Sequence, residues 1–253
     1  MASLTRLALE TLEDPTASLG QKQVAATALL EAFTVGVETP PRAPMMVWRW
    51  LLAHGDSSIR FLRTHEIPGA DVVRDALSVL KARDIGDDAF ELAAAVVPGR
   101  HPEVVSEEDL AAIADRLITD QRARRFAWMV QRVHEERGLS LEFLTLLTNR
   151  LTGSENPVVR EIGVEIGFVR GFEPPFATRM LTDPSPLVRT AVADALEKTE
   201  DPNRDLAIAI IRDHFGIERH RSVISAMHHA LGTLVRASGR RIRMPEPPTG
   251  DEN

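Results

Sequence analysis

The eight histidines are the residues of this chain best suited to metal binding and acid–base catalysis. Two histidines ligate one metal from a helix when they stand four residues apart, and no pair in this sequence has that spacing. His228 and His229 are adjacent, so a helix would turn their side chains about 100° apart. We therefore expect no metal site, and histidines that lie on solvated surfaces or cap helices. The eight are His54, His65, His101, His134, His214, His220, His228 and His229.

Neighbouring carboxylates are the next candidates, because a pair can divide the roles of general acid and general base. Their positions are typical of helix starts, where they complement the helix dipole, and of solvated helix faces. The absence of cysteine and tyrosine excludes thiolate nucleophiles, thiolate metal sites and phenolic acid–base chemistry. The sequence contains no glycine-rich phosphate loop and no GxSxG turn, so we expect no enzyme activity and no cofactor. The carboxylate neighbours are Asp87-Asp88, Glu107-Glu108-Asp109 and Glu135-Glu136.

The 253-residue chain has a net charge of −7 that is unevenly distributed. Lysine and arginine number 11 against 19 acidic residues over 1–120, and 8 against 6 over 203–253. Nucleic-acid-binding domains usually have an overall basic excess, so this composition disfavours a nucleic-acid partner. No apolar run is long enough to span a membrane, and Glu10 interrupts any export signal, so we expect a cytoplasmic protein. The preference for arginine over lysine indicates a GC-rich, bacterial genome.

The elements that must position these residues are helices. Apolar residues recur every three or four positions nearly throughout, whereas alternating strand-like runs are hard to find. The sequence therefore predicts an all-α protein. The expected helices lie near 3–13, 21–34, 44–54, 57–65, 70–83, 87–97, 106–119, 121–137, 141–152, 157–170, 175–182, 187–199, 203–215 and 219–238.

Several helix ends carry sequence signals. "SEED", from Ser106 to Asp109, has the form of a capping box, and Ser185 is placed to cap the helix that follows it. Gly138 and Gly216 stand where glycines end helices. Prolines mark further helix starts at Pro157, Pro186 and Pro202.

Similar segments recur along the chain. "NPVVREIGVEIG" (156–167) aligns with "SPLVRTAVADAL" (185–196) at an offset of 29 residues, and "VISAMHHAL" (223–231) follows at 35. The start of each of the first two is a capping residue, a proline, two apolar residues and an arginine. Upstream, "SSIRFL" (57–62) and "VVRDALSVL" (72–80) repeat the apolar–arginine start. Recurrence of one helical pattern at intervals of this size is typical of repeat proteins.

This pattern resembles HEAT-like repeats of the short type found in bacterial proteins. The resemblance implies antiparallel helix pairs stacked into a right-handed α-solenoid, clearest over 150–238 within one domain over 1–239. The proline-rich segment 36–44 is expected to separate a helical pair over 1–35 from the rest, and 240–253 to form a disordered tail. The residues that carry the resemblance are Val159-Arg160, Val188-Arg189 with Ala191, Ala195 and Leu196, Ile59-Arg60, and Val73-Arg74 with Ala76 and Leu77.

An arginine in the first helical turn recurs at Arg60, Arg74, Arg160 and Arg189. The helix dipole disfavours a cation there by only ~0.3–1 kcal/mol. A hydrogen bond to a carboxylate or carbonyl in the adjacent turn, contributing ~1.5–3 kcal/mol, would outweigh that cost. We therefore interpret these arginines as structural, with a binding surface as the alternative. Ser154 stands where the next repeat has Asp183, so an unbroken arginine–aspartate ladder is not expected.

Some HEAT-like proteins are DNA glycosylases that use a tryptophan, an aspartate and an arginine in a basic groove, and others are lyases that attach tetrapyrroles. A glycosylase site on one helix face would place an aspartate one turn after the tryptophan. This sequence does not: Trp48 is followed by Leu52, Trp50 by His54 and Trp128 by Arg132.

Gly163, Gly167 and Gly171 stand four residues apart on one face of a helix, where the next repeat has Val192, Leu196 and Glu200. Glycine inside a helix costs ~1 kcal/mol relative to alanine, so we expect each of these glycines to have a role in packing or binding. Close approach of neighbouring helices is one interpretation, with Gly171 as a helix end. A groove for a partner helix or ligand at Gly163 and Gly167 is the other.

Two further segments are candidate partner surfaces. The helix "MMVWRWLLAH" (45–54) is apolar on most sides, so Trp48 and Trp50 are either buried or part of a protein interface. The last helix carries a polar stripe that includes Gly232 and either caps a solenoid or binds an anionic partner. The remaining residues of that stripe and its basic extension are Arg221, Ser225, His228, Arg236, Arg240, Arg241 and Arg243.

These observations predict a non-enzymatic scaffold or adaptor that binds a protein partner through the concave face or the terminal helix of a HEAT-like solenoid. Two alternatives remain open. One is a nucleic-acid-binding protein related to the alkylation-repair glycosylases, although their catalytic residues are not matched. The other is a regulatory subunit of a multiprotein enzyme.

Overall fold

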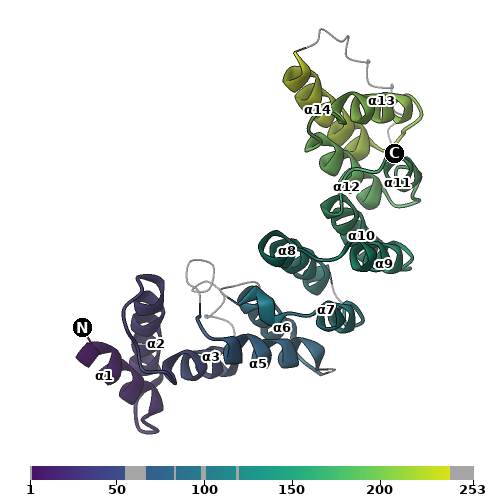
Figure 1. Ribbon diagram of the computed structural model, residues 1–253. Coiled ribbons are helices and arrows are strands. Elements are labelled where there is room, and N and C mark those ends of the chain that lie inside the picture. Colours follow the sequence, from purple (N-terminus) through teal and green to yellow (C-terminus); the bar gives the residue numbers. More distant parts are fainter. Residues whose placement is uncertain (1, 55–66, 83, 98–100, 118–119, 240–253) are drawn as a thin grey trace. The chain divides into compact units, whose positions relative to one another are not determined.

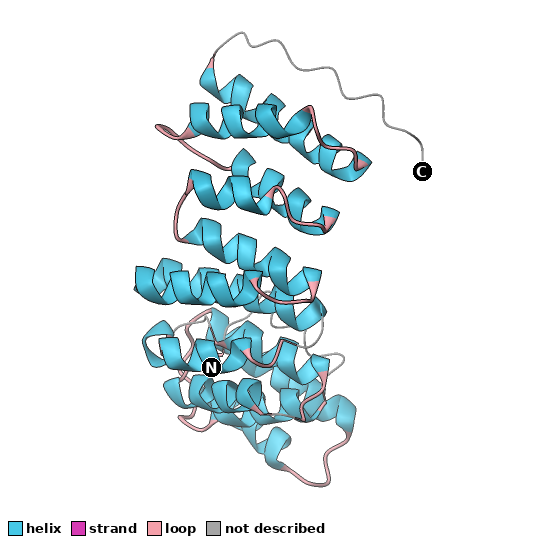
Figure 2. Cartoon of the chain, turned by 90° about the vertical axis from the view of Figure 1, so that its right-hand side faces the viewer, coloured by secondary structure: helices cyan, strands magenta, loops and turns pink. Residues whose placement is uncertain are grey.

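The described part of the protein is built from α-helices. The computed structural model describes residues 2–54, 67–82, 84–97, 101–117 and 120–239. Over these residues the chain forms 13 α-helices. Figure 2 shows these helices joined by loops, with no strand among the described residues. The all-α prediction is confirmed, and most helix ends fall within two residues of those expected. The helix expected at 57–65 and the tail at 240–253 lie outside the described residues.

The first compact unit spans Met1–Leu139. In it, α1 and α2 pack on each other and on α3, α3 packs on α5, and α6 packs between α5 and α8 (Figure 1). The short 3-10 turn η2 (Pro102–Val104), which the sequence did not predict, contacts both α5 and α8. The helices are α1 (Ala2–Glu13), α2 (Leu19–Thr34), α3 (Ala43–Ala53), α5 (Ala70–Lys81), α6 (Asp87–Val96), α7 (Glu107–Ala114) and α8 (Asp120–Arg137).

The second compact unit spans Ser140–Asn253, and its described residues, 140–239, form three successive helix pairs, α9/α10, α11/α12 and α13/α14. The second helices of the pairs pack in a row, α10 on α12 and α12 on α14, and α11 packs on α13. The helices are α9 (Leu141–Thr152), α10 (Pro157–Val169), α11 (Pro174–Met180), α12 (Pro186–Glu197), α13 (Arg204–Phe215) and α14 (Arg221–Ser238).

The boundary between the units differs from the break expected at the proline-rich segment 36–44. That segment is bound to the first two helices: the Val37 N–H donates to the Ala32 carbonyl at 2.9 Å, and Arg42 pairs with Glu13 at 2.9 Å. The chain instead divides after Leu139, beside Gly138, whose φ of +73° ends α8. Prolines restrict backbone angles but do not prevent contacts of this kind.

Local signals account for most of the helix ends. Ser106 and Asp109 form the expected capping box, and Pro157 and Pro186 occupy first turns. Ser185 is at the N-cap of α12, but its hydroxyl makes no capping bond; the Asp183 carboxylate accepts the Ser185 N–H at 2.8 Å instead. The helix α7 ends at Ala114, short of the expected 119, because the chain tightens into a turn in which the Arg116 N–H donates to the Ile113 carbonyl.

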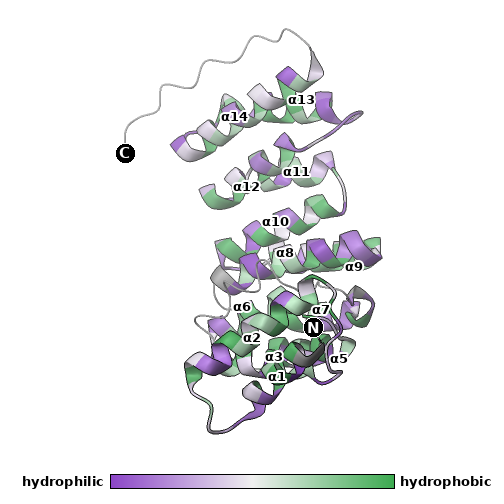
Figure 3. Cartoon of the chain, turned by 90° about the vertical axis from the view of Figure 1, so that its left-hand side faces the viewer, coloured by the Kyte–Doolittle hydropathy of each residue, from purple (hydrophilic) through white to green (hydrophobic). Residues whose placement is uncertain are grey.

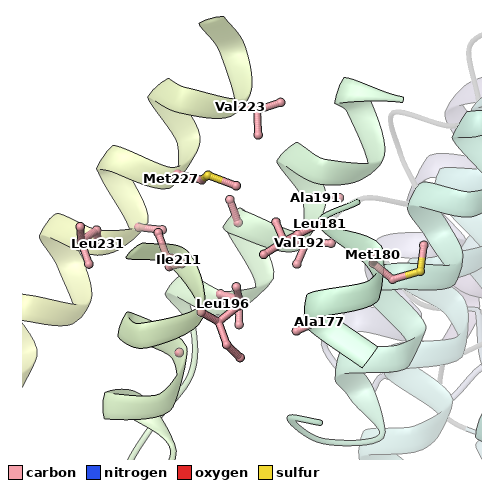
Figure 4. Close-up of a cluster of buried hydrophobic side chains, with 14 of the residues drawn as sticks. Ala177, Met180, Leu181, Ala191, Val192, Leu196, Ile211, Val223, Met227 and Leu231 are labelled. Carbon is pink, nitrogen blue, oxygen red and sulfur yellow. The ribbon is translucent and has the colours of Figure 1, made fainter. Parts of the chain in front are cut away.

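The core of the second unit shows why its helices must stack. In α12 the buried residues are Val188, Ala191, Val192, Ala193 and Leu196. Ala195, one of the residues that carry the resemblance, is only half-buried. Ala193 is buried instead because α12 is covered by α10 on one side and α14 on the other. Figure 4 shows Val192 and Leu196 among side chains from α11, α13 and α14, such as Met180, Ile211 and Met227.

Candidate functional site

Two arginines of the second unit each donate four hydrogen bonds, and we call these arrangements arginine clamps. Arg160, in the first turn of α10, donates from Nη1 to the carbonyls of Ser154 and Glu155 at 3.0 and 2.9 Å. Its Nε and Nη2 donate to the two carboxylate oxygens of Asp183 at 2.8 and 2.9 Å. One guanidinium therefore holds the loop before its own helix and the loop before α12.

Arg189 repeats this geometry in the next pair. Its Nη1 donates to the carbonyls of Asp183 and Pro184 at 2.7 and 3.2 Å. Its Nε and Nη2 donate to Glu218 at 2.7 and 3.0 Å, in the loop before α14. The planar fork of arginine is suited to this bidentate contact, which a lysine could not make. The expected hydrogen bond to a carboxylate or carbonyl is confirmed for Arg160 and Arg189.

The carboxylates of the clamps are buried and ionised. The side chains of Asp183 and Glu218 are 7% and 8% exposed. Burial alone would raise the pKa of each carboxyl group, but arginine and backbone N–H donors lower both pKa values below the ordinary ones. Glu218 also accepts the backbone N–H groups of Arg219 and His220, each at 2.8 Å. Because their oxygens are bound and remain charged, these groups hold loops together and do not supply protons.

Glu218 is the residue that the sequence analysis missed. The ladder was expected to break because Ser154 stands where the next repeat has Asp183. Arg160 contacts only the backbone carbonyl of Ser154, so no aspartate side chain is required at that position. The carboxylate that pairs with Arg189 is a glutamate, Glu218. The signal was available: Glu218 follows Asp183 by 35 residues, the same offset that aligns Val188 with Val223.

The other two first-turn arginines do not extend the ladder. Arg74 pairs with Asp71, three residues earlier on its own helix, and both side chains are largely exposed. Because that carboxylate lies on the same helix, the pair joins no two loops. Arg60 lies outside the described residues. Arg122, which the sequence analysis did not select, is 4% exposed and donates to Asp87 and to the Ile85 carbonyl ahead of α6.

The two candidate tryptophans lie inside the first unit. Trp48 is fully buried, and its indole N–H donates to Asp75 Oδ2 at 2.7 Å, linking α3 to α5. Trp50 is 9% exposed and stacks on His54 with ring centroids 4.9 Å apart. Burial, the first of the two interpretations, therefore describes both, and neither indole offers an exposed surface to a partner.

The two groove candidates are also covered. A Cβ at Gly163 would lie 2.7 Å from the Thr152 backbone nitrogen, and one at Gly167 would lie 2.5 Å from the Phe176 ring. Close packing of α10 on α9 and of α10 on Phe176 accounts for both glycines and fills the space in which a groove was considered. Gly171 has a φ of +125° just after α10, as expected for a helix end.

The candidate residues of α14 are brought together on its outer face. Arg221, Ser225, His228 and Arg236 are exposed and Gly232 is half-buried. The opposite side of the helix is buried and includes Val223, Met227, Ala230, Leu231 and Leu234. Figure 3 shows the resulting mixture of hydrophilic and hydrophobic stretches along this helix. Arg240, Arg241 and Arg243 lie outside the described residues.

One carboxylate departs from the pattern of ion-paired acids. Burial raises the pKa of Asp194 on α12, and the nearby Glu197 raises it further, whereas Lys198 and His229 oppose the shift. His229 Nε2 lies 3.3 Å from Glu197 Oε1 and links α14 to α12. Among the described residues, no group of three histidine or carboxylate side chains could hold a metal ion.

None of the helices in the described ranges is both long and apolar enough to cross a membrane. A scan against protein-family models finds no match for the chain, and searches of curated proteins and of solved structures find none either.

Proposed function

We propose that this protein is a HEAT-like repeat protein that acts in the cytoplasm as a non-enzymatic scaffold or adaptor for another protein. Its helix pairs would form a right-handed α-solenoid of the short type, with the second helix of each pair lining the concave face. The observation that carries this proposal is the repeated clamp, because Arg160 and Arg189 join three helix pairs in the same way.

Stacked pairs of one kind build an extended surface along a row of helices, which is how repeat proteins bind other macromolecules. The row formed by α10, α12 and α14 is such a surface. The acids of the clamps are occupied by arginines, which supports a structural rather than a catalytic role for the strongest polar contacts of this unit.

Site-specific photo-crosslinking tests the proposal. A photoreactive amino acid would replace Asp194 on α12 or Lys198, the residue that follows α12; both are exposed. Matched controls would carry it at exposed positions of first helices, Thr178 on α11 and Ala209 on α13. In cells of the source organism, we expect one discrete protein adduct from the α12 positions and none from the controls. Adducts of equal yield from all four positions, or none from α12, would refute the proposal.

A further inference from the structure

The outer face of α14 carries basic side chains and no acidic ones. We define the α14 basic face as Arg221, Ser225, His228, Gly232 and Arg236. The helix Arg221–Ser238 contains no aspartate or glutamate, in a chain whose net charge is −7. Within the described residues, neither arginine of this face pairs with a carboxylate; Arg236 Nη2 donates only to Thr233 Oγ1, at 3.2 Å.

Part of this face corresponds to a surface that earlier pairs bury. His228 aligns with Val164 of α10 and Ala193 of α12, and both of those residues are fully buried in the core. His228 is exposed, and its ring lies 6.3 Å from that of Phe215. The flank that α10 and α12 cover with the next helix is therefore open and polar in α14.

The helix α14 lacks the clamp arginine, so it cannot bind a further helix pair in the way that α10 and α12 bind the pairs that follow them. The position that holds Arg160 in α10 and Arg189 in α12 is Ile224 in α14. Ile224 is 9% exposed and has no guanidinium to hold a following loop. A further repeat, or the first pair of a second copy, would therefore dock without the contacts that join the other pairs.

We infer that the α14 basic face binds an acidic segment of a partner protein, an inference that rests on the proposed function and specifies its partner. The two arginines are 15 residues apart on the helix, or roughly 22 Å. Between them, Ser225 and Gly232 are small enough for a peptide backbone to approach. Guanidinium groups that lack carboxylate partners attract carboxylates by charge complementarity, which also specifies orientation.

The same charges favour a peptide over a nucleic acid. Only two arginines lie on the face, whereas sequence-independent binding to DNA draws on many phosphate contacts. The helix α13, which packs on α14, exposes Asp205 and Asp213 as well as Arg212, so it adds no continuous basic track for a phosphate backbone.

Fluorescence anisotropy with a labelled acidic peptide tests the inference on the full chain. The peptide would have about 16 residues with a glutamate in each helical turn, enough to span the face. The variant Arg221→Glu/Arg236→Glu reverses the face, and Arg49→Glu/Arg137→Glu makes the same charge change at exposed positions in the first unit. We expect binding that weakens with salt, an affinity at least about tenfold lower in the first variant, and little change in the control.

The reversed variant should in turn bind a lysine peptide of the same design. Absence of binding to the acidic peptide at low salt, or an equal loss in both variants, would overturn the inference. So would tighter binding of a labelled DNA duplex that is lost in Arg221→Glu/Arg236→Glu, because it would identify the face as a nucleic-acid surface. Crosslinks from Asp194 that persist in the reversed variant would uphold the proposed function while this inference failed.

Discussion

At the scale of single residues, the guanidinium of Arg189 decides how two loops are held. It satisfies two carbonyls and both oxygens of a buried glutamate, while Arg74 makes one exposed contact on its own helix. The two arginines share a sequence context of an apolar residue before and an apolar stripe after. They differ in how far their side chains are buried and in how many hydrogen-bond acceptors each one contacts.

Replacement of Arg189 by alanine is expected to lower the free energy of unfolding of the second unit by about 2–4 kcal/mol, because it leaves Glu218 buried without its cation. Arg74→Ala should cost no more than about 1 kcal/mol, since its partner is solvated. Urea unfolding followed by circular dichroism measures both. Equal losses in the two variants would show that the clamp has no special role.

The clamps also predict a dependence on pH. The pKa values of Asp183 and Glu218 are lower in the folded protein than in the unfolded chain, so their contribution is complete above about pH 5. It is lost as the pH falls through the folded-state pKa values. We expect the melting temperature to fall below about pH 4, and to fall less steeply in Asp183→Asn/Glu218→Gln. Asp71→Asn, which changes an exposed carboxylate, is the control and should leave the fall of the melting temperature with pH unchanged. The same unchanged pH dependence in the double variant would contradict this prediction.

At the scale of elements, the position of α10 depends on two residues that have no side chain, Gly163 and Gly167. Its two buried glycines let it approach α9 and Phe176 more closely than any side chain would allow. The sequence showed that these positions depart from the repeat, but only the packing identifies what occupies the space.

Gly163→Ala is expected to destabilise the protein by about 1–3 kcal/mol because the new methyl group would meet the Thr152 backbone, which cannot move without α9. Gly167→Ala should also destabilise, and Phe176→Leu should recover part of that loss by removing the ring atoms in its way. Gly20→Ala in α2 is the control: nothing lies within 4 Å, so it should be neutral or stabilising by up to about 1 kcal/mol. Thermal melts in which Gly20→Ala lowers the melting temperature as much as Gly163→Ala or Gly167→Ala would refute this account.

At the scale of the whole molecule, the chain folds into two compact units, and each has its own buried residues. All three tryptophans, Trp48, Trp50 and Trp128, lie in the first unit, so their fluorescence reports on that unit alone. Circular dichroism at helical wavelengths reports on both.

This arrangement predicts that Arg189→Ala shifts the unfolding curve measured by circular dichroism and leaves the tryptophan fluorescence midpoint unchanged. Trp48→Phe, which removes the bond to Asp75, should lower the fluorescence midpoint instead. Joint movement of both curves in either variant would mean that the units unfold as one cooperative body.

The sequence by itself determined the helices, because the 3.6-residue periodicity, prolines and caps are local properties of the chain. It also determined the polar stripe of α14 and the recurrence of the arginines. Only the tertiary structure decided which arginines act as clamps, since Arg74 and Arg189 differ in what lies opposite them and not in their neighbours along the chain. It likewise decided that Trp48 is buried, that Gly163 packs against α9 and that Glu218 pairs with Arg189, because burial and pairing depend on residues elsewhere in the sequence.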